Sequence, residues 1–546
     1  MLEMLGAFQP MLDAALSDLA AQNALARLWS HDHTLWKPDP REIRNRLGWL
    51  HSPEEMLGKL AQLTALVHSL QAEGYTRAVL LGMGGSSLAP EVFRKTFGVR
   101  AGYLDLNVLD STDPDAILAL EQRLDLGSTL FIVATKSGGT VETLSFFKYF
   151  YNQAAAELGE SEVGRHFIAI TDPGSRLVAL AQRYQFRTTF LNNPNIGGRY
   201  SALSHFGLVP AALLGVDLPM LLERAIAAAH ENAAEVPAAR SPAMRLGAVL
   251  GEMAKAGRDK ATLILSPEIE SFGDWAEQLI AESTGKDGKG ILPVVGEPLG
   301  AREVYGDDRL FIHLHLKNDE TQLADVADLA QAGHPVLRIQ YQDRYDMGGQ
   351  FFLWELATAI AGQRLGIHPF DQPDVESAKA LAREMVAAYK EDGSLPEMDP
   401  APLSPSRLHA FLREAEQGAY VALQAYVQPT AEVQDALNLL RRAIRDHTHL
   451  ATSMGFGPRF LHSTGQLHKG DGGNGLFIQF TADNRHDLPI PDEAGSERSS
   501  LTFNVLKTAQ ALGDQQALLR GGRRVLRFHL SEDVPHELQI LAKSLT

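Results

Sequence analysis

Short apolar runs alternate with helical patterns through the first half of the chain. The runs RAVLLG, LNVLD, TLFIVA and HFIAIT are each followed by a turn and then by a segment with helical spacing of apolar residues. Strands that alternate with helices in this way pair in parallel and carry helices on both faces of the sheet. The pattern therefore predicts a first α/β unit over residues 76–237.

A second α/β unit of similar plan is predicted over residues 238–392. Its expected strands are ATLILSP, LFIHLHL and HPVLRIQY, and its clearest expected helices are GDWAEQLIAEST and FFLWELATAIAGQRL. In parallel sheets of this class, ligands bind beyond the carboxyl ends of the strands. The turns that follow the strands are therefore the places to look for a site.

The remaining parts of the chain flank these two units. Residues 1–75 are expected to form a helical segment, because the N-terminal stretch is amphipathic. The stretch Gly393–Ser406 is rich in proline and serine and is typical of a linker. Residues 407–546 are expected to form a smaller C-terminal α/β segment.

Composition narrows the class of protein. The chain has 546 residues, 45% hydrophobic and 21% charged, as in soluble globular proteins of two to four domains. Lys plus Arg number 50 and Asp plus Glu number 67, so the net charge is −17. This balance argues against binding to nucleic acid or to an anionic membrane surface. Any anion site must therefore be built locally.

Targeting and redox signals agree with a cytoplasmic protein. The chain has no cysteine, which excludes disulfides, thiolate metal sites and cysteine nucleophiles. No basic residue precedes Arg27, so the start of the chain lacks the charge of a signal peptide. No apolar run reaches the ~18 residues that span a bilayer.

Two glycine-rich turns follow predicted strands. VLLGMGGSSLAP places Gly82, Gly84 and Gly85 after the first strand, and VATKSGGTVET places Lys136 in the turn after the third. Glycine lets a backbone approach a ligand closely, and the helix that follows presents unpaired N–H groups. The first turn fits neither the P-loop nor the GxGxxG pattern, although Asp110 leaves a dinucleotide-binding interpretation open.

Together the turns suit a phosphate monoester. If the two strands are neighbours in a parallel sheet, both turns lie on the same edge. They then offer the hydroxyls and the ammonium of Ser86, Ser137, Thr140 and Lys136. The alternative is a pair of tight turns with a solvated lysine.

Several side chains are candidates for chemistry on a small ligand. Arg199 follows Gly197 and Gly198, and its planar guanidinium is suited to stabilising an oxyanion. Gln278 and Glu282 are four residues apart, so they share one face of a predicted helix. Glu282 lies near the carboxyl end of that helix, where a carboxylate is a candidate general base. Taken singly, each is also explained as a surface group.

Further along, Gln372 is expected just before a helix and Lys379 on its second turn. A helix cap and a solvated lysine are the alternative interpretation. His313 and His315 share one face of a predicted strand, but no third ligand stands at a zinc-binding spacing and HExxH is absent. We therefore predict no metal.

Five stretches occur in the same order as in one known family. GMGGSSLAP, TKSGGTVET, NIGGRYS, QLIAESTGKDGKG and PFDQPDVESAK, between Arg77 and Lys379, resemble glucose-6-phosphate isomerases of the sugar-isomerase-domain superfamily. HDHTLWKPDP and HSTGQLHKGDGGNGLFIQFTAD look closest to the isomerase half of transaldolase–isomerase fusions. The resemblance implies two sugar-isomerase α/β units and, as a candidate partner, a transaldolase.

The resemblance also implies an activity. It is the reversible isomerisation of glucose 6-phosphate and fructose 6-phosphate through an enediolate, in glycolysis and gluconeogenesis, without metal or cofactor, by a homodimer that shares residues across its interface. By the match of motifs, the phosphate-holding positions are Gly85, Ser86, Lys136, Ser137 and Thr140. The remaining matches are Glu282 as base, Arg199 after Gly198 beside the enediolate, Gln278 and Gln372 on the sugar, and Lys379 in ring opening.

One motif is out of place. Short bacterial relatives carry a His-Ser-x-Gly-Gln motif soon after the Glu-Ser-x-Gly-Lys motif, and its histidine helps to open the sugar ring. Here the region after Lys286 lacks a histidine, and HSTGQ appears at His462 in the C-terminal segment. Either this segment folds back to deliver His462, which we favour, or another group opens the ring.

Other functions remain open at this point. A non-catalytic sugar-phosphate sensor would keep the phosphate turns but need no base. An isomerase with additional phosphomannose activity differs only in tolerance at C2. A nucleotide-dependent oxidoreductase is disfavoured by the departure from GxGxxG.

Overall fold

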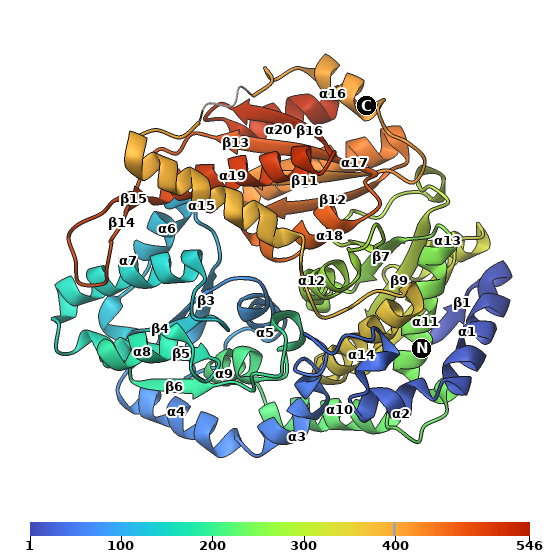
Figure 1. The fold of residues 1–546 in the computed structure, drawn as a ribbon, viewed down its shortest axis with the longest axis horizontal. Coiled ribbons are helices and arrows are strands. Elements are labelled where there is room, and N and C mark those ends of the chain that lie inside the picture. The colour runs from blue at the N-terminus through green and yellow to red at the C-terminus, as the bar shows by residue number, and fades with distance from the viewer. Residues whose placement is uncertain (397–399) are drawn as a thin grey trace.

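The structure is a computed structural model that describes residues 1–396 and 400–546. Three mainly parallel sheets, each flanked by helices, make up the molecule (Figure 1). This confirms the α/β class with two parallel-sheet units and a C-terminal α/β segment. The predicted linker Gly393–Ser406 includes residues 397–399, which lie outside the described residues.

The first sheet has the order β3-β2-β4-β5-β6, with all strands parallel. Its strands are β2 (Arg77–Gly82), β3 (Asp105–Leu109), β4 (Thr129–Ala134), β5 (Phe167–Thr171) and β6 (Thr188–Leu191). Every residue of β4 is buried, because helices cover both faces of the sheet. This explains why the strand is a continuous apolar run rather than an alternating one.

The second sheet has the order β1-β10-β9-β7-β8. Its parallel strands are β7 (Lys260–Leu265), β8 (Leu292–Val294), β9 (Arg309–Leu316) and β10 (Val336–Tyr341). At its edge, β1 (Leu2–Met4) pairs antiparallel with β10. The N-terminal segment is therefore not wholly helical. Its first residues pair with a strand that lies more than 300 residues later in the chain, and no local sequence pattern reveals such a pairing.

The C-terminal sheet has the order β12-β11-β13-β16 and is fully parallel. Its strands are β11 (Tyr420–Tyr426), β12 (Ala451–Phe456), β13 (Gly475–Ala482) and β16 (Arg524–Leu530). A short antiparallel pair, β14 (Pro489–Ile490) and β15 (Leu501–Thr502), lies beside the first unit, where Asn152 donates to the carbonyl of Ser496.

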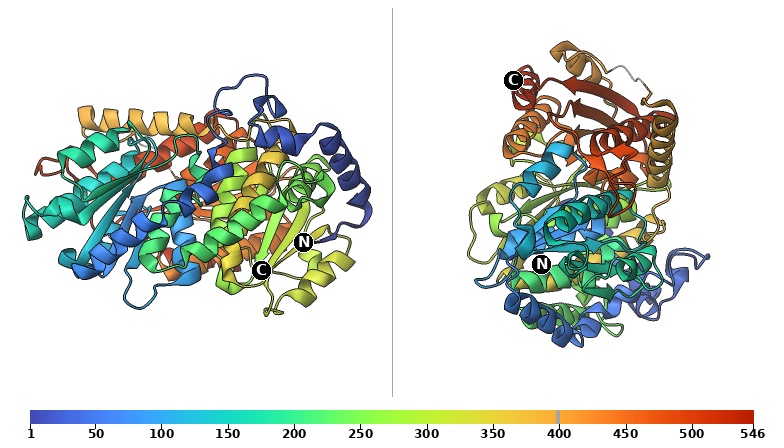
Figure 2. Two further views of the ribbon diagram at one scale, coloured as in Figure 1. Left: turned by 90° about the horizontal axis from the view of Figure 1, so that it is seen from below. Right: turned by 90° about the vertical axis from the view of Figure 1, so that its left-hand side faces the viewer.

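Helices fill the space around the sheets (Figure 2). In chain order they are α1 (Gln9–Ala21), α2 (Ala24–Trp29), α3 (Ser52–Leu57), α4 (Leu60–Ala72), α5 (Leu88–Phe97), α6 (Pro114–Glu121), α7 (Val141–Leu158), α8 (Arg176–Arg183), α9 (His205–Leu214), α10 (Leu218–Glu231), α11 (Pro242–Lys255), α12 (Phe272–Thr284), α13 (Leu323–Gln331), α14 (Met347–Leu365), α15 (Val375–Asp392), α16 (Pro405–Leu412), α17 (Ala431–Thr448), α18 (Gly465–Gly470), α19 (Phe503–Arg520) and α20 (Val534–Lys543). None of these described helices is long and apolar enough to cross a membrane.

The C-terminal sheet is tied to the rest of the molecule by two long helices. α15 follows the second unit in sequence but packs along α19 of the C-terminal segment (Figure 1). The C-terminal sheet also has a hydrophobic core of its own, built around Leu423, Ile478 and Phe480. The three sheets therefore meet as separate layers, and the candidate residues gather where they meet.

Candidate functional site

The two glycine turns lie side by side at one edge of the first sheet. β2 and β4 are neighbouring parallel strands, and Gly82 is paired with Ala134 at their carboxyl ends. The first turn continues into a short 3-10 helix, η4 (Gly84–Ser86), in which Gly84 has a φ of +56°. A residue with a side chain rarely adopts this conformation, which explains the glycine. The predicted neighbourhood of the turns is confirmed.

The hydroxyls of these turns are arranged at two helix starts. Ser86 precedes α5, and Thr140 is the N-terminal cap residue of α7. Thr140 Oγ1 lies 2.9 Å from Thr135 Oγ1, and Ser137 Oγ accepts a 3.2 Å hydrogen bond from the Gly139 N–H. Unpaired N–H groups at helix starts favour an anion, so this edge has the chemistry of a phosphate site.

Lys136 is held by acceptors of the protein itself. Its ammonium forms an ion pair with Asp172 and donates a 3.0 Å hydrogen bond to the carbonyl of Pro194. Burial raises the pKa of Asp172, although the contact with Lys136 lowers it in part. The turn therefore carries less free positive charge than its sequence suggests.

The loop that bears Arg199 sits directly on the first turn. A Cβ atom added at Gly85 would lie 2.0 Å from the carbonyl oxygen of Gly198, which is closer than atoms can approach. Two glycine motifs more than 100 residues apart are thus in backbone contact. The φ of Gly85 is not in the left-handed region, so backbone conformation alone does not require glycine here. The close contact with Gly198 does.

Arg199 is buried, and every one of its N–H donors has an acceptor. Nε donates to Ser283 Oγ at 2.8 Å, and one terminal nitrogen donates to Glu282 Oε2 at 3.1 Å and to Gln372 Oε1 at 2.9 Å. The other terminal nitrogen donates to the carbonyls of Pro369 and Asp371. The guanidinium therefore joins the predicted residues Glu282 and Gln372 and fixes both.

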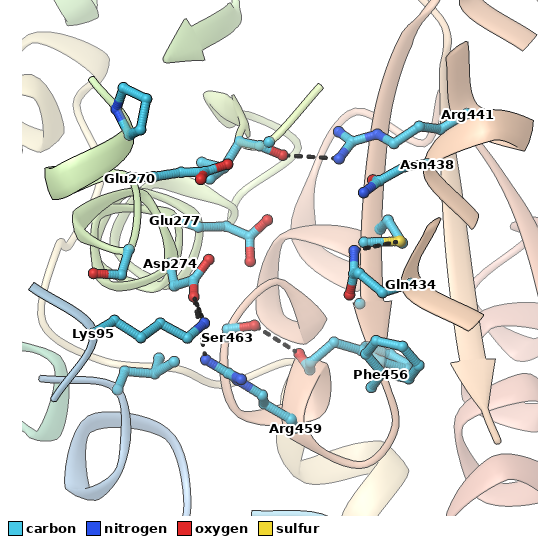
Figure 3. Close-up of a pocket in the computed structure, with 18 of the residues that line it drawn as sticks. Lys95, Glu270, Asp274, Glu277, Gln434, Asn438, Arg441, Phe456, Arg459 and Ser463 are labelled. Carbon is cyan, nitrogen blue, oxygen red and sulfur yellow. Dashed lines mark hydrogen bonds and ion pairs between the residues drawn. The ribbon is translucent and has the colours of Figure 1, made fainter. Parts of the chain in front are cut away.

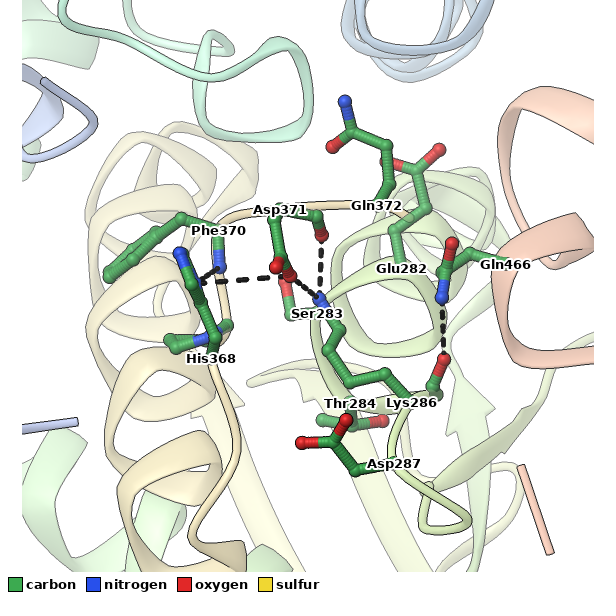
Figure 4. A network of polar contacts seen from close by, with 12 residues as sticks. Glu282, Ser283, Thr284, Lys286, Asp287, His368, Phe370, Asp371, Gln372 and Gln466 are labelled. Atoms are coloured by element: carbon green, nitrogen blue, oxygen red, sulfur yellow. Dashed lines mark hydrogen bonds and ion pairs between the residues drawn. The ribbon is translucent and has the colours of Figure 1, made fainter. Parts of the chain in front are cut away.

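Glu282 lies in the last turn of α12, one helical turn beyond Gln278. Its carboxylate is 12% exposed and is paired with Arg199. Figure 4 shows the side chains of Glu282 and Gln372 pointing in the same direction, beside the loop that carries Asp371. A carboxylate with one oxygen held by a guanidinium is fixed in place, and a fixed position is what a general base requires.

A buried lysine supports this loop from below. Lys286 donates to the backbone carbonyl of Asp371 at 2.6 Å and to its carboxylate at 2.8 Å. Burial and the nearby Arg199 lower the pKa of Lys286 to about 8, although Asp371 offsets part of the effect. The contact fixes the stretch that contains Gln372.

His462 comes from the C-terminal segment and reaches the first turn. Its backbone carbonyl accepts a 2.7 Å hydrogen bond from Gln278 Nε2 and packs against Gly84. Its ring nitrogen Nε2 lies 3.0 Å from Glu142 Oε1. The C-terminal segment therefore folds back onto the first unit and brings His462 among the other candidates.

Glu142 and Gln510 are missing from the sequence-based list. Gln510 of α19 donates a 2.7 Å hydrogen bond to the same Glu142 oxygen that faces His462, and it accepts one from Thr112 at 2.9 Å. Burial raises the pKa of Glu142, but the His462 contacts outweigh it and lower the pKa overall. Glu142 belongs to the motif TKSGGTVET, and this could have identified it as a site residue. No local sequence pattern identifies Gln510 as one.

The nearby Gln466 is a third residue of the site that the sequence did not predict. It accepts from the backbone N–H of Asp374 at 2.9 Å and donates to the carbonyl of Gly285 at 2.9 Å. A Cβ atom at Gly285 would lie 2.2 Å from Cα of Leu467. The HSTGQ segment is thus held between two of the matched motifs. The presence of Gln466 in this motif was the sequence signal that could have identified it.

Lys379 lies on the second turn of α15, as expected, and is partly exposed. Its ammonium is near enough to Glu142 to contribute to lowering the pKa of that carboxyl. It therefore lies near the carboxyl that contacts His462. Across residues 1–396 and 400–546, no cluster of three or more side chains is suited to hold a metal ion.

Residues 51–290 match the family model described as phosphoglucose isomerase. A glucose-6-phosphate isomerase of Thermus thermophilus is 30% identical over 395 residues, which cover 63% of this chain and 91% of that protein. The chain belongs to the phosphoglucose isomerase family.

Solved structures agree with this family assignment in fold. A hypothetical protein of Thermus thermophilus is 27% identical with a TM-score of 0.60, and the match covers 70% of this chain and 98% of that one. A glucose-6-phosphate isomerase of Chlamydia trachomatis has a TM-score of 0.59 at 18% identity, over 70% of this chain and 86% of that one. The matched family model ends before the C-terminal segment that carries His462.

Proposed function

We propose that the chain interconverts glucose 6-phosphate and fructose 6-phosphate through an enediolate, with Glu282 as the base. The observation that carries the proposal is the buried pair of Glu282 and Arg199 beside the glycine turns. Membership of the phosphoglucose isomerase family supports the same reaction. A sensor needs no carboxylate fixed in this way, so the pair favours an enzyme.

The charges of the reaction balance on these two residues. Glu282 removes the proton from C2 of the open-chain aldose, which neutralises the carboxylate and leaves a negative charge on the enediolate oxygen. Arg199 then exchanges its hydrogen bond with Glu282 for one with that oxygen, because the charge has moved there. The hydroxyl proton on O2 passes to O1, and return of the carbon-bound proton from Glu282 to C1 then gives the ketose and restores the ion pair.

We assign the phosphate end of the substrate to the two glycine turns. The hydroxyls of Ser86, Ser137 and Thr140, with the backbone N–H groups at the starts of α5 and α7, offer donors to three phosphate oxygens. Gly85 and Gly198 keep the turn and the Arg199 loop in contact. Binding energy at the phosphate orients the distant carbon atoms toward Glu282.

We assign ring opening to the other side of the site. It requires one group that donates a proton to the ring oxygen and one that accepts the proton of the anomeric hydroxyl. His462, in contact with Glu142, and Lys379 are the available pair. Gln278 and Gln372 are assigned to the sugar hydroxyls, because both flank Glu282 and Arg199.

The decisive experiment compares two glutamates of one helix. Glu282→Gln is expected to lower kcat by roughly 10³-fold, because it removes a general base. Fructose 6-phosphate affinity, measured by calorimetry, should stay within a few-fold. Glu277→Gln, five positions earlier and facing away from the site, is the matched control and should keep normal turnover. Near-normal turnover by Glu282→Gln would show that Glu282 is not the base. A wild-type protein that binds fructose 6-phosphate without converting it would be a sensor.

Assembly and location stay predictions. Every residue of the proposed site lies in one chain, so we propose that a second copy is not needed to complete it. The predicted homodimer is tested by light scattering, and the transaldolase partner by copurification from the native host. The cytoplasmic location is tested by fractionation.

A further inference from the structure

A cavity of about 390 Å³ opens between α12 and the C-terminal sheet (Figure 3). It is lined by residues of α12, of α17, of the end of β12 and of η12 (Arg459–His462). None of the residues assigned to the isomerase site lines it. The cavity lies against the part of α12 that bears Asp274 and Glu277, and it has no role in the proposed reaction.

Its position is one where α/β proteins bind ligands. The residues Met454, Gly455 and Phe456 are the carboxyl end of a parallel strand, and the opposite wall belongs to another domain. Ligand sites favour both the carboxyl edges of parallel sheets and domain interfaces. The volume is also in the range of pockets for small molecules.

The cations of the cavity wall already have acidic or carbonyl partners. Arg459 lies 3.3 Å from Asp110 and 3.6 Å from Asp274, and Lys95 lies 3.6 Å from Asp274. Arg441 donates to the carbonyls of Val295 and Thr452. An anionic ligand would have to displace these contacts.

Two acceptors of the wall are in contrast free. Among the described residues, none donates a hydrogen bond to the Glu277 carboxyl or forms an ion pair with it. Oδ1 of Asn438, on the facing helix α17, is buried without a hydrogen-bond partner. Figure 3 shows the Glu277 carboxyl pointing into the space between α12 and α17. A ligand here must donate hydrogen bonds.

Charge points to the same kind of ligand. Burial and the neighbouring Asp274 raise the pKa of Glu277, Arg441 and Arg459 lower it in part, and together these effects bring it to about 8. No cation among the described residues forms an ion pair with this carboxyl. The aromatic ring of Phe456 in the same wall is suited to contact a cation through its face.

We propose that this cavity binds a small organic cation through a primary ammonium group, held by Glu277 and Asn438, and that the bound cation modulates ring opening. An ammonium group has three donors, which satisfies both free acceptors and compensates one carboxylate. The neighbouring Met454 and Phe456 accommodate the hydrocarbon part of the ligand.

The link to ring opening is built into two elements. Arg459 and Phe460 line the cavity, and His462 ends the same short helix at the isomerase site. Glu277 faces the cavity, while Gln278, the next residue, holds the His462 carbonyl. A ligand that moves either element therefore moves His462.

The binding test uses n-butylamine as the probe and n-butanol, of similar shape but uncharged, as its control. We expect calorimetry to detect butylamine and not butanol. Glu277→Gln is expected to weaken butylamine at least tenfold, and Asn438→Leu, on the other wall, several-fold. Glu157→Gln, the same change on an exposed part of α7, is the matched control and should bind as the wild type does. The site would be overturned if butanol bound as well as butylamine, or if Glu277→Gln bound butylamine as well as the wild type does. It would also be overturned if no butylamine binding were seen at ten times the concentration that detects a ligand of millimolar affinity.

Binding must also depend on pH in one direction. Ionised Glu277 is the form that holds an ammonium group, so butylamine affinity should rise from pH 6.5 to 8.5 as the carboxyl releases its proton. The other charged groups that face Glu277 are Asp274, Arg441 and Arg459. Glu277→Gln should abolish this dependence. A flat pH profile in the wild type would contradict the role of Glu277.

The regulatory part has its own readout. Saturating butylamine should change turnover of glucose 6-phosphate at least twofold, but not that of a 4,5-dideoxyhexose 6-phosphate, which has the same chain length and lacks the hydroxyls that close a ring. Glu277→Gln should turn over both substrates normally and lose the effect of butylamine. If butylamine bound without changing turnover, the proposed effect on ring opening would be wrong, whereas the proposed binding site would stand.

Discussion

The two ends of the proposed isomerase site are built in different ways. At the phosphate end, two neighbouring strands of one sheet each finish in a glycine turn, and the donors are supplied locally by these turns. At the other end, Glu282, Arg199, Gln372 and His462 come from four segments and are held by hydrogen bonds over 83 to 320 positions of sequence. The local end depends on backbone shape, whereas the assembled end depends on single side chains.

The largest effect is expected at the joint between the two ends. Gly85→Ala places a methyl group where the Gly198 carbonyl lies, so the Arg199 loop must move. We expect loss of measurable turnover and about 3 kcal/mol of stability, by analogy with overpacked cores. Urea unfolding and a coupled isomerase assay measure both.

Gly198→Ala is the matched control, because its added Cβ has no atom within 4 Å. Its stability should equal that of the wild type. If Gly85→Ala were equally harmless, the two turns would not be in the contact described.

His462→Asn tests the assembled end. We expect roughly a 10²-fold loss of kcat with glucose 6-phosphate, as for other acid–base groups. The 4,5-dideoxyhexose 6-phosphate should be turned over almost as fast by this variant as by the wild type, because it needs no ring opening. Equal losses for both substrates would show that His462 acts elsewhere.

Gln510→Leu should have a smaller effect on the same step. It removes one of the two hydrogen bonds to Glu142 Oε1, and a bond of 1 to 1.5 kcal/mol corresponds to roughly a tenfold change in kcat. The acyclic substrate again serves as the internal reference. Gln516→Leu, on the same helix with no hydrogen bond among the described residues, is the control.

The smallest effect is expected for Asp172→Asn at the phosphate end. The change removes the negative charge beside Lys136 but keeps an oxygen acceptor. A phosphate ester should then bind more tightly, with KM lower by about twofold to fivefold, as for a partly exposed ion pair. A higher KM would mean that Asp172 holds Lys136 in place for the phosphate.

The same contrast explains what the sequence reveals. The runs RAVLLG and TLFIVA predict β2 and β4, and GDWAEQLIAEST predicts most of α12, because apolar periodicity is a local property. The motif order also points to Glu282 and Arg199. Their roles stay predictions until the variants are measured.

Other features are invisible locally. β1 is three residues long and becomes a strand only because β10 offers an edge. Gln510 and Gln466 are ordinary polar residues of amphipathic helices, and only folding brings them to Glu142 and Gly285. The C-terminal sheet was predicted as an α/β segment without its strand order, since order is set by packing between distant elements.

The clamp that Gln466 forms on Gly285 has a consequence for how the chain matures during synthesis. Domains fold in order as they leave the ribosome. A growing chain that ends before residue 400 has both glycine turns and Glu282 in place, but neither Gln466 nor His462. Such a nascent protein would trap sugar phosphate without opening its ring, and competence would arrive only with the last quarter of translation.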